Sequence, residues 1–404
     1  MNEVMERRMK VRVHVRSGDS LWYYSQLFML PVNLLVDSNR KINPTALQIG
    51  QEVQIPGFNV SEYTIKQGDT LWKLATARNL SVDVLLLLNQ HVNPNALSIG
   101  TMLSLPTRII TPLMDRKRSY GYQTLLNDLD KIQNAYPFIR VDVIGESVLG
   151  QPIYELKIGN GQKKVHINAS FHANEWITTP ILMALLNSYL LSLTNAKPLR
   201  GLATMPFYNE TELSIVPMVN PDGVDLVLSG PPTEVREQVL EMNQGSDEFS
   251  GWKANIRGVD LNKQYPANWE IEQGRNPDIP SPRDFPGKQP LTEPEAIALA
   301  ELVRESNFDR VLAFHTQGEE FYWGYEGLEP PESAVIAEEF ARVSGYRSVQ
   351  NIDSYAGFKD WFIQDYRKPG FTMELGKGVN PLPLSQYEDI YEEMLGVFLA
   401  SLYM

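Results

Sequence analysis

The stretch "KVHINASFHANEWITTPILMALLNSYLLSL" (residues 164–193) decides the fold class of the larger part of this chain. Its opening residues form a nearly continuous apolar run, which is typical of a strand buried on both faces of a sheet. A long apolar segment of helical length, residues 178–193, follows directly. A buried strand followed at once by a helix predicts an α/β sheet with helices on both faces. His172 and Glu175 stand between the two elements, three positions apart.

The same alternation of strands and helices continues towards the C-terminus. Buried strands are predicted in "ELSIVPMVNPDG" (212–223), "DRVLAFH" (309–315) and "FTMELG" (371–376), and helices in "EPEAIALAELVRES" (293–306) and "PESAVIAEEFARVSG" (331–345). In sheets of this class, sites assemble from polar residues at the ends of strands. The polar residues that follow these strands are therefore the candidates for a functional site.

Composition limits the classes of function. A chain of 404 residues exceeds an ordinary domain of ~100–200 residues, so more than one domain is expected. The net charge of -13 argues against nucleic acid as a partner, because that affinity rests on lysines and arginines. Since the chain has no cysteine, disulfides and thiolate zinc sites are excluded, and any metal must be held by His, Asp or Glu.

Two features bear on location. No run approaches the ~18 apolar residues needed to cross a bilayer, so no membrane span is predicted. The N-terminal stretch "MNEVMERRMKVRVHVRSG" (1–18) is charged where a signal peptide would be apolar. These observations predict synthesis in the cytoplasm and leave the compartment of action open, with a spore or the cell wall among those that fit.

The first quarter of the chain is an internal repeat with an offset of 50 residues. Residues 15–56 align with residues 65–106 without a gap. The first-copy residues that recur unchanged are Gly18, Asp19, Leu21, Trp22, Asn39, Asn43, Pro44, Leu47, Ile49, Gly50 and Pro56. Chance does not produce that number of identities at one offset.

Each copy predicts a βααβ unit. In the first copy, an alternating strand leads to a Gly-Asp-Ser turn, whose hydroxyl caps a helix that begins near Leu21. A second helix ends near Asn39, and an Asn-Pro loop leads to a short closing strand before Pro56. The second copy repeats this order 50 positions later.

These residues resemble the LysM module, with its Gly-Asp-Thr-Leu-Trp opening and its Leu-x-x-Gly-x-x-Leu-x-Ile-Pro ending. The resemblance implies binding to glycans that contain N-acetylglucosamine, chiefly peptidoglycan or chitin. The alternative for either copy is a spacer without a ligand. Trp22 and Trp72 fall on the first helix of each copy and are expected in the core. The predicted domains are LysM modules at 10–58 and 60–108, a linker at 109–119 and a catalytic domain at 120–404.

The pair His172 and Glu175 is weak evidence for a metal on its own, because His-x-x-Glu arises by accident in many chains. His315 ends another predicted buried strand, so two imidazoles and a carboxylate are expected to meet at one edge of the sheet. Three such ligands and one water suit a catalytic zinc. The other zinc pattern, His-Glu-x-x-His, is absent.

Further motifs follow in a fixed order: "VPMVNPDGVD" (216–225), "WKANIRGVDLNKQYP" (252–266), "PSPRDFPGKQPLTEPEA" (280–296), "SYAGFKDWF" (354–362) and "FTMELG" (371–376). As a set, with His-x-x-Glu before them and a late histidine between them, they resemble the zinc carboxypeptidase family. The resemblance spans about residues 120–404. It implies an α/β fold with a mixed sheet, preceded here by the two small βααβ LysM modules.

The resemblance also implies roles for individual residues. One Zn2+ ion per catalytic domain would be held by three ligands: His172, Glu175 and His315. Glu374 matches the general base and acid, with an ion pair to a surface lysine as its alternative. Arg257 matches the arginine that polarises the scissile carbonyl, with an ion pair to Asp260 as its alternative.

Substrate contacts are implied at two further positions, Asn262 and Tyr355, although the spacing from Tyr355 to the Asp-Trp pair is shorter than in carboxypeptidase A. Family members clamp a terminal carboxylate with an arginine where this chain has Lys263, and a lysine cannot give a two-pronged grip. His166, inside the strand that precedes His172, is expected to be a core residue.

The change to Lys263, together with the LysM modules, makes the chain similar to the bacterial γ-D-glutamyl-L-diamino acid peptidases. We therefore expect cleavage of the γ-D-glutamyl to diaminopimelate bond of peptidoglycan stem peptides, with Asn262, Lys263 and Tyr355 meeting carboxylates of the diaminopimelate side. The alternatives are a conventional metallocarboxypeptidase that acts on peptides, or a non-catalytic wall-binding protein.

Overall fold

A computed structural model describes residues 9–115 and 118–404. The first eight residues of the charged N-terminal stretch and residues 116–117 of the predicted linker lie outside the described part. The chain separates into two compact units. The first runs to Met114 and includes residues 127–140 and 187–206, and the second comprises residues 115–126, 141–186 and 207–404. The division at Met114 falls inside the predicted linker, and the domain boundaries themselves remain predictions.

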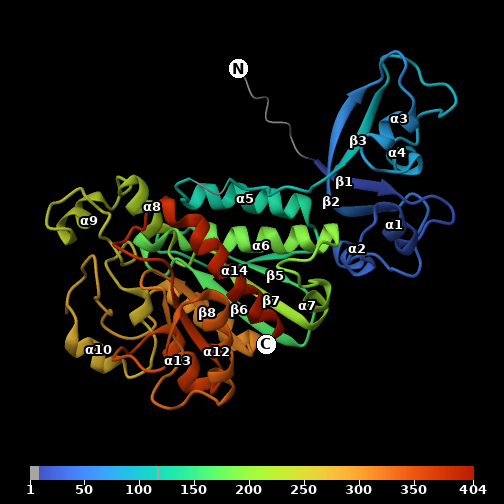
Figure 1. Ribbon diagram of the computed structural model, residues 1–404. Coiled ribbons are helices and arrows are strands. Elements are labelled where there is room, and N and C mark those ends of the chain that lie inside the picture. The colour runs from blue at the N-terminus through green and yellow to red at the C-terminus, as the bar shows by residue number, and fades with distance from the viewer. Residues whose placement is uncertain (1–8, 116–117) are drawn as a thin grey trace. The chain divides into compact units, whose positions relative to one another are not determined.

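The repeated segment folds as two βααβ units that share one strand (Figure 1). Its three strands pair antiparallel in the order β1-β2-β3. The elements of this segment are β1 (Met9–His14), α1 (Leu21–Phe28), α2 (Val32–Ser38), β2 (Glu52–Thr64), α3 (Leu71–Thr76), α4 (Val82–Leu88) and β3 (Met102–Arg108).

The predicted helix starts are confirmed. The Ser20 hydroxyl accepts a hydrogen bond from the Tyr23 backbone N–H and so caps α1, and Thr70 caps α3 in the same way. The repeated asparagines tie helix to strand: the Asn89 amide donates to the Leu85 and Ser104 carbonyls and accepts from the Ser104 N–H. These side-chain bonds explain why the capping residue and the asparagine recur in both copies.

One strand boundary differs from the prediction. The closing strand of the first copy does not stop before Pro56 but continues as β2 through Thr64. The register between β1 and β2 shifts between Lys10 and Val11, whose partners are Asn59 and Ile55. Pro56 falls inside this irregularity, where no ladder hydrogen bond needs the N–H that proline lacks. The strand therefore tolerates its proline.

The two repeat units share a single hydrophobic core built from both copies. The Arg16 guanidinium of the first module donates two hydrogen bonds to the Asp83 carboxylate of the second, at 2.8 and 2.9 Å. The Tyr23 hydroxyl donates to the same carboxylate. The two repeat units thus share a strand and a hydrophobic core, and a bidentate ion pair joins them. They form one compact body rather than two independent domains.

The expectation that Trp22 and Trp72 lie in the core is wrong. Both side chains are exposed, each at 66% of the maximum. The reason is helical geometry: Leu21 and Tyr24 of α1 face the core, and the position that directly follows Leu21 points away from it. The two tryptophans therefore form equivalent apolar surface points of the two modules.

The part of the chain after the repeat contains an eight-stranded sheet, which is mixed, as predicted. Its order is β10-β9-β11-β8-β6-β7-β5-β4. Strands β7, β6, β8 and β11 run parallel to one another, whereas β9 pairs antiparallel with β11 and β5 pairs antiparallel with β7. The strands are β4 (Arg140–Glu146), β5 (Pro152–Ile158), β6 (Lys163–Ala169), β7 (Thr211–Val216), β8 (Arg310–His315), β9 (Glu320–Tyr322), β10 (Arg347–Val349) and β11 (Gly370–Glu374). The strand predicted over 212–223 ends at Val216, because Pro217 cannot donate to the ladder.

Helices cover both faces of this sheet (Figure 1), as predicted. Val311 and Ala313 of β8 pack in one core cluster with α11 and α13. Phe371 of β11 is level with Leu312, which alternation places on the opposite face, and its ring lies 4.8 Å from that of Phe340 on α12. The helices are α5 (Tyr122–Ala135), α6 (Thr178–Asn195), α7 (Met205–Glu210), α8 (Pro221–Ser229), α9 (Arg236–Met242), α10 (Trp269–Arg275), α11 (Pro294–Ser306), α12 (Glu332–Ser344), α13 (Phe358–Tyr366) and α14 (Tyr387–Tyr403).

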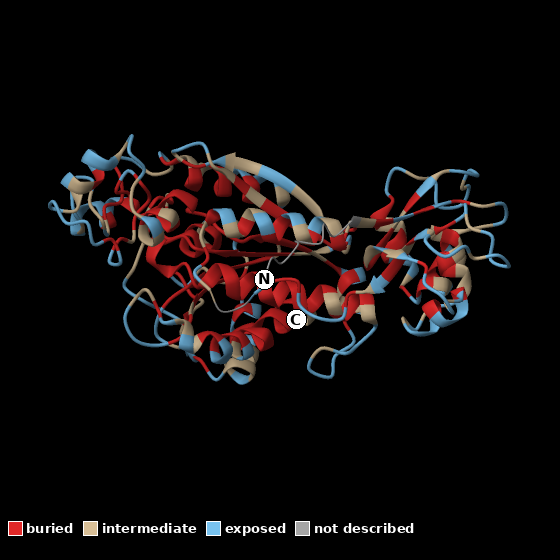
Figure 2. Cartoon of the chain, turned by 90° about the horizontal axis from the view of Figure 1, so that it is seen from above, coloured by how far each residue is buried: buried red, intermediate tan, exposed pale blue. Residues whose placement is uncertain are grey.

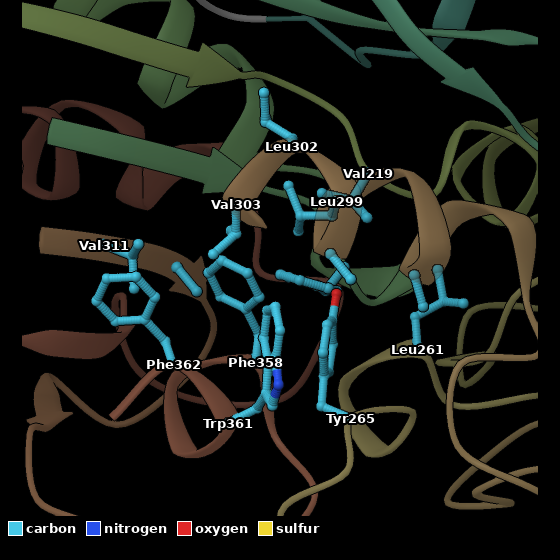
Figure 3. Close-up of a cluster of buried hydrophobic side chains, with 14 of the residues drawn as sticks. Val219, Leu261, Tyr265, Leu299, Leu302, Val303, Val311, Phe358, Trp361 and Phe362 are labelled. Carbon is cyan, nitrogen blue, oxygen red and sulfur yellow. The ribbon is translucent and has the colours of Figure 1, made fainter. Parts of the chain in front are cut away.

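Aromatic rings pack against one another in the core on the α11 and α13 face (Figure 3). The Tyr265 ring stacks on Trp361 at 5.4 Å and meets Phe358 edge-on at the same distance. Buried residues, red in Figure 2, fill the central strands such as β6 and β8, whereas the edge strands β4 and β10 contain none. This packing gives the ends of β6, β8 and β11 a rigid base.

One helical segment of this core is apolar enough to resemble a membrane span, although the sequence predicted none. Residues Ala173–Asn195 have the length and composition of a membrane span. However, 89% of that apolar window is buried inside the fold. The segment is therefore accounted for as the central helix of a folded domain.

A buried carboxyl in the first turn of α11 predicts a pH-dependent stability. Burial, and then Asp222 and Glu293, raise the pKa of Glu295 from 4.5 to about 7. Below pH 4.5 the group is protonated in both states, and stability is lost as the pH rises towards 7, because only the unfolded chain ionises freely. As the pH rises from 5.5 to 8, the free energy of unfolding of Glu295→Gln should increase by roughly 2 kcal/mol relative to that of the wild type. Urea unfolding at each pH measures this difference.

The matched control is Glu301→Gln, an exposed position on the same helix. The difference in free energy of unfolding between Glu301→Gln and the wild type should be the same at pH 5.5 and pH 8. A difference for Glu295→Gln that stays constant across this range would contradict the assignment of a raised pKa to Glu295.

Candidate metal centre

The ends of three neighbouring parallel strands place the candidate residues together. His315 is the last residue of β8, and Glu374, the last of β11, is its direct partner in the register. His172 and Glu175 follow β6, which pairs with β8 on its other side. Because parallel strands end at the same edge of a sheet, these side chains emerge from one edge.

His172, Glu175 and His315 converge on one point and are all buried. Their ligand atoms lie within 4.8 Å of one another. The His172 Nδ1 atom is 2.8 Å from Glu175 Oε1, and the His315 Nδ1 atom is 3.1 Å from His172 Nδ1 and 3.0 Å from Glu175 Oε2. This trio of two nitrogens and a carboxylate is the donor set of a catalytic zinc.

The protonation of His172 also fits a metal. Its other ring nitrogen, Nε2, lies 3.2 Å from Asp260 Oδ1. Burial opposes ionisation of Asp260, but Lys253 and then His172 outweigh it and hold its pKa well below its usual range. The carboxylate therefore accepts the Nε2 proton. Burial opposes protonation of the ring, but Glu175 and Asp260 outweigh it and raise the pKa of His172. A metal ion at Nδ1 would take the place of the second ring proton.

The charges of the trio are strongly coupled. Burial opposes the ionisation of Glu175, but His172 and His315 outweigh it and keep the pKa of this carboxyl well below its ordinary value. Burial lowers the pKa of His315. An anionic carboxylate beside a neutral imidazole matches the ligand states that zinc requires.

Glu374 lies beside the trio with a different electrostatic character. Burial, and then the charge of Glu175, raise its pKa to about 8, while His172 and Lys253 act in the opposite direction. Among the described residues no hydrogen-bond partner is recorded for its carboxyl group. An unpaired carboxyl that can both take and release a proton near neutral pH is suited to general acid and base catalysis.

Three residues around the cluster were not singled out from the sequence. The Asn380 amide donates to the Thr316 carbonyl at 3.0 Å and approaches Glu175 Oε1 at 3.5 Å. The Thr316 N–H donates to Glu175 Oε2 at 3.2 Å, and Asp260 holds His172. Asp260 had a sequence signal in "GVDLN", whereas nothing around Asn380 marked it.

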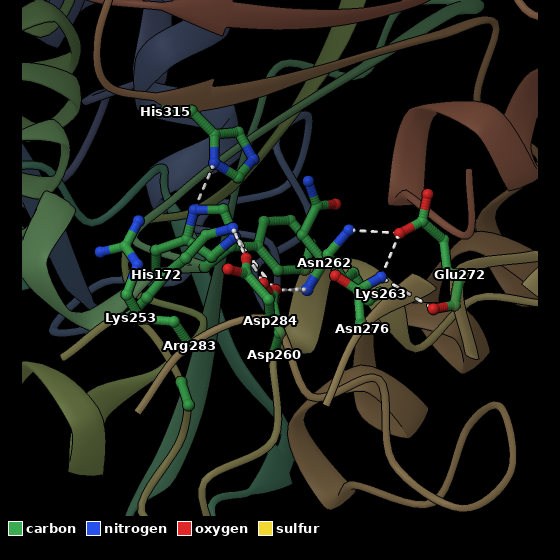
Figure 4. A network of polar contacts seen from close by, with 12 residues as sticks. His172, Lys253, Asp260, Asn262, Lys263, Glu272, Asn276, Arg283, Asp284 and His315 are labelled. Atoms are coloured by element: carbon green, nitrogen blue, oxygen red, sulfur yellow. Dashed lines mark hydrogen bonds and ion pairs between the residues drawn. The ribbon is translucent and has the colours of Figure 1, made fainter. Parts of the chain in front are cut away.

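The structure does not bring Arg257 to this cluster. Its side chain is 54% exposed, and its nearest acidic partner is Glu293 at 3.5 Å rather than Asp260. The cation beside Asp260 is Lys253, whose Nζ lies 2.8 Å from Asp260 Oδ2 (Figure 4). The ion pair of Arg257 with Asp260, which was the alternative for this residue, is therefore wrong, whereas its catalytic role stays a prediction.

Two of the predicted substrate residues, Lys263 and Tyr355, contact a buried carboxylate, Glu272. It accepts a hydrogen bond from Lys263 Nζ at 2.6 Å (Figure 4). It also accepts one from the Tyr355 N–H at 3.0 Å. The side-chain oxygen Oδ1 of Asn262 accepts a hydrogen bond from the Phe358 N–H at 3.0 Å, so the side-chain NH2 group is left to donate to a ligand. Arg275 lies over the Tyr355 ring, 5.1 Å from its centre, and adds a cation that sequence reasoning missed.

His166 is a core residue, as expected. Its Nδ1 donates to the Ser214 hydroxyl at 2.9 Å, its Nε2 accepts from the Asn168 amide at 3.1 Å, and its ring stacks on Phe308. Burial lowers its pKa to about 3. With both nitrogens in use, His166 has no role as a ligand.

Comparison with known proteins extends these observations. Residues 125–395 match the zinc carboxypeptidase family, and residues 13–56 and 63–106 match the LysM domain. A γ-D-glutamyl-L-diamino acid endopeptidase 1 from Lysinibacillus sphaericus is 62% identical over 392 residues, covering 96% of this chain and 99% of the relative.

Solved structures support the fold. Bovine thrombin-activatable fibrinolysis inhibitor, solved in complex with tick carboxypeptidase inhibitor, superimposes with a TM-score of 0.56 at 20% identity, covering 71% of this chain and 97% of that one. The carboxypeptidase A from Helicoverpa armigera gives a TM-score of 0.53 at 19% identity, covering 72% and 75%. At these identities the likeness concerns the fold.

Proposed function

Since this chain belongs to the zinc carboxypeptidase family and carries two LysM domains, we propose that it is a zinc peptidase of peptidoglycan. It hydrolyses the bond between γ-D-glutamate and diaminopimelate in stem peptides. The observation that carries the proposal is the buried convergence of His172, Glu175 and His315 beside Glu374, in a chain that is 62% identical to a γ-D-glutamyl-L-diamino acid endopeptidase.

In this proposal the zinc ligands are His172 Nδ1, His315 Nδ1 and the Glu175 carboxylate. A zinc ion held there would lower the pKa of a bound water towards ~7 and polarise the scissile carbonyl. Glu374 accepts a proton from the attacking water and delivers it to the leaving amine. Asp260 keeps the His172 ring in place and in one tautomer, and Asn380 and the Thr316 N–H keep Glu175 in place.

Substrate is held by Asn262 and Tyr355, in our proposal, on the side of the diaminopimelate. Asn262 donates its amide to a substrate carboxylate. Lys263 is engaged by Glu272 at 2.6 Å, so its charge is largely neutralised in the free protein. Lys263 would therefore bind a terminal carboxylate less strongly than an unpaired arginine. This fits an enzyme that does not require a free C-terminal residue at this position.

The LysM domains bind glycan and hold the catalytic domain near its substrate. We propose that this glycan contains N-acetylglucosamine and that both modules bind it. Trp22 and Trp72 are exposed at equivalent positions, so both modules present the same apolar surface residue to a ligand. Nucleic acid is not a partner in this account. Within residues 9–115 and 118–404, one helix is long and apolar enough for a membrane span, and 89% of its apolar window is buried in the fold.

The test is incubation with L-Ala-γ-D-Glu-meso-diaminopimelate and with its α-linked isomer, each with and without a chelator. We expect release of diaminopimelate from the γ-linked peptide alone, and no release when the chelator is present. Cleavage restricted to the α-linked peptide would instead identify a conventional carboxypeptidase. A zinc-loaded protein that cleaves neither peptide would be a wall-binding protein without catalysis.

A further inference from the structure

Lys253 lies next to the segment that carries the metal ligands, and the sequence suggested no role for it. Its carbonyl oxygen accepts a hydrogen bond at 3.0 Å from the N–H of Ala173, the residue after His172. The Asn220 amide joins the same two segments, because it donates to the Phe171 and Ala254 carbonyls at 3.1 Å each. The loop that carries Lys253 is therefore fixed to the segment that carries the ligands.

The side chain of Lys253 is held by two carboxylates (Figure 4). Its Nζ lies 2.8 Å from Asp260 Oδ2 and 3.3 Å from Asp284 Oδ1, and only 17% of the side chain is exposed. An ammonium group has three N–H donors, so one donor remains beyond these two partners. Asp260 thus holds both the metal ligand His172 and the ammonium group of Lys253.

Lys253 is the cation that Asp260 and Asp284 hold beside the His172 ligand. Burial alone would lower the pKa of Lys253, but Asp260 and Asp284 outweigh it and raise the pKa, so the group stays cationic.

We propose that Lys253, rather than Arg257, is the cation that stabilises the oxyanion formed during hydrolysis, an inference that rests on the proposed function. Water attacks the scissile carbonyl carbon, its proton passes to Glu374, and the carbonyl electron pair moves to oxygen. The third N–H of Lys253 donates to that oxygen. The C–N bond then breaks, the proton moves from Glu374 to the leaving nitrogen, and Lys253 keeps its own proton throughout.

The exchange of a guanidinium for an ammonium group has a physical consequence. An arginine presents a flat fork of donors, whereas a lysine presents a compact point charge on a flexible stem. A donor directed at a developing oxyanion contributes about 100-fold or more in kcat. Since the oxyanion exists only after attack, Lys253 acts on kcat and leaves KM nearly unchanged.

The experiment compares Lys253→Met, Lys253→Arg and Arg257→Ala in the zinc-loaded full chain, with Lys197→Met as an exposed control. We expect Lys253→Met to lose about 100-fold in kcat, with KM and zinc content unchanged. Lys253→Arg, Arg257→Ala and Lys197→Met should stay within about tenfold of the wild type, since each keeps a cation at position 253.

A phosphinate analogue of the tetrahedral intermediate gives a readout independent of turnover. Its affinity should fall about 100-fold in Lys253→Met and stay near the wild-type value in Arg257→Ala. The proposal is overturned if Arg257→Ala loses 100-fold and Lys253→Met does not, or if Lys253→Met loses zinc, which would make Lys253 a support of the metal ligands.

Should Lys253→Met not fold, the results for Arg257→Ala and Lys253→Arg decide, because a 100-fold loss in either contradicts the proposal. The wild type serves as the control for function. If it fails to cleave the γ-linked peptide, the proposed function is at fault rather than the assignment of Lys253.

Discussion

Glu374→Gln is expected to lower kcat by about 10³-fold while the protein keeps its zinc and its fold. The reason lies in the surroundings of the carboxyl group. Glu374 ends β11 level with His315, and burial beside Glu175 raises its pKa to about 8. Glutamine keeps the size of the side chain but cannot accept the proton of the attacking water. The measurement is steady-state turnover of the γ-linked tripeptide, with zinc content determined on the same samples.

A matched control is Glu338→Gln, an exposed position on α12, which should keep full activity. Because a neutral residue replaces a partly buried acid, Glu374→Gln should be at least as stable as the wild type in thermal unfolding. An active Glu374→Gln enzyme would remove this residue from the mechanism.

The second large effect concerns the metal ligands. His315→Ala should bind no stoichiometric zinc and show no measurable peptidase activity, because it removes one of three buried donors. Zinc that binds only the folded state stabilises it by RT ln(1 + [Zn]/Kd), which is about 4 kcal/mol at 1,000 times Kd. We therefore expect added zinc to raise the Tm of the metal-free wild type and to leave that of His315→Ala unchanged.

His91→Ala is the matched control, since His91 is an exposed histidine in the second LysM module. It should bind zinc with the wild-type stoichiometry and respond to zinc in the same way. A His315→Ala protein that retains one tightly bound zinc would show that the metal lies elsewhere.

Sequence patterns predicted the elements of the fold well where local signals were strong. The strand before His172, the long helix after it and the capped helices of the repeat follow from apolar runs and capping residues. They could not predict that β2 passes through Pro56, because this depends on a register shift against β1. Nor could they place Trp22, since an aromatic residue on a short helix fits a core or a surface equally well.

The site shows a similar division. His172, Glu175, His315 and Glu374 stand directly at the ends of buried strands, so their meeting was visible from strand order. Strand order could not show whether Lys253 or Arg257 is the cation beside the metal centre, because both residues lie in one irregular loop. Its course depends on tertiary contacts, such as the hydrogen bond from the Ala173 N–H to the Lys253 carbonyl.

The central claim is that two imidazoles and one carboxylate hold a single zinc ion, and anomalous diffraction from a crystal of the zinc-loaded protein at the zinc absorption edge tests it most directly. We expect one strong anomalous peak per chain, ~2.0–2.2 Å from His172 Nδ1, His315 Nδ1 and the Glu175 carboxylate. A crystal with stoichiometric zinc bound at other residues, or with these three side chains turned away from any metal, would contradict the account.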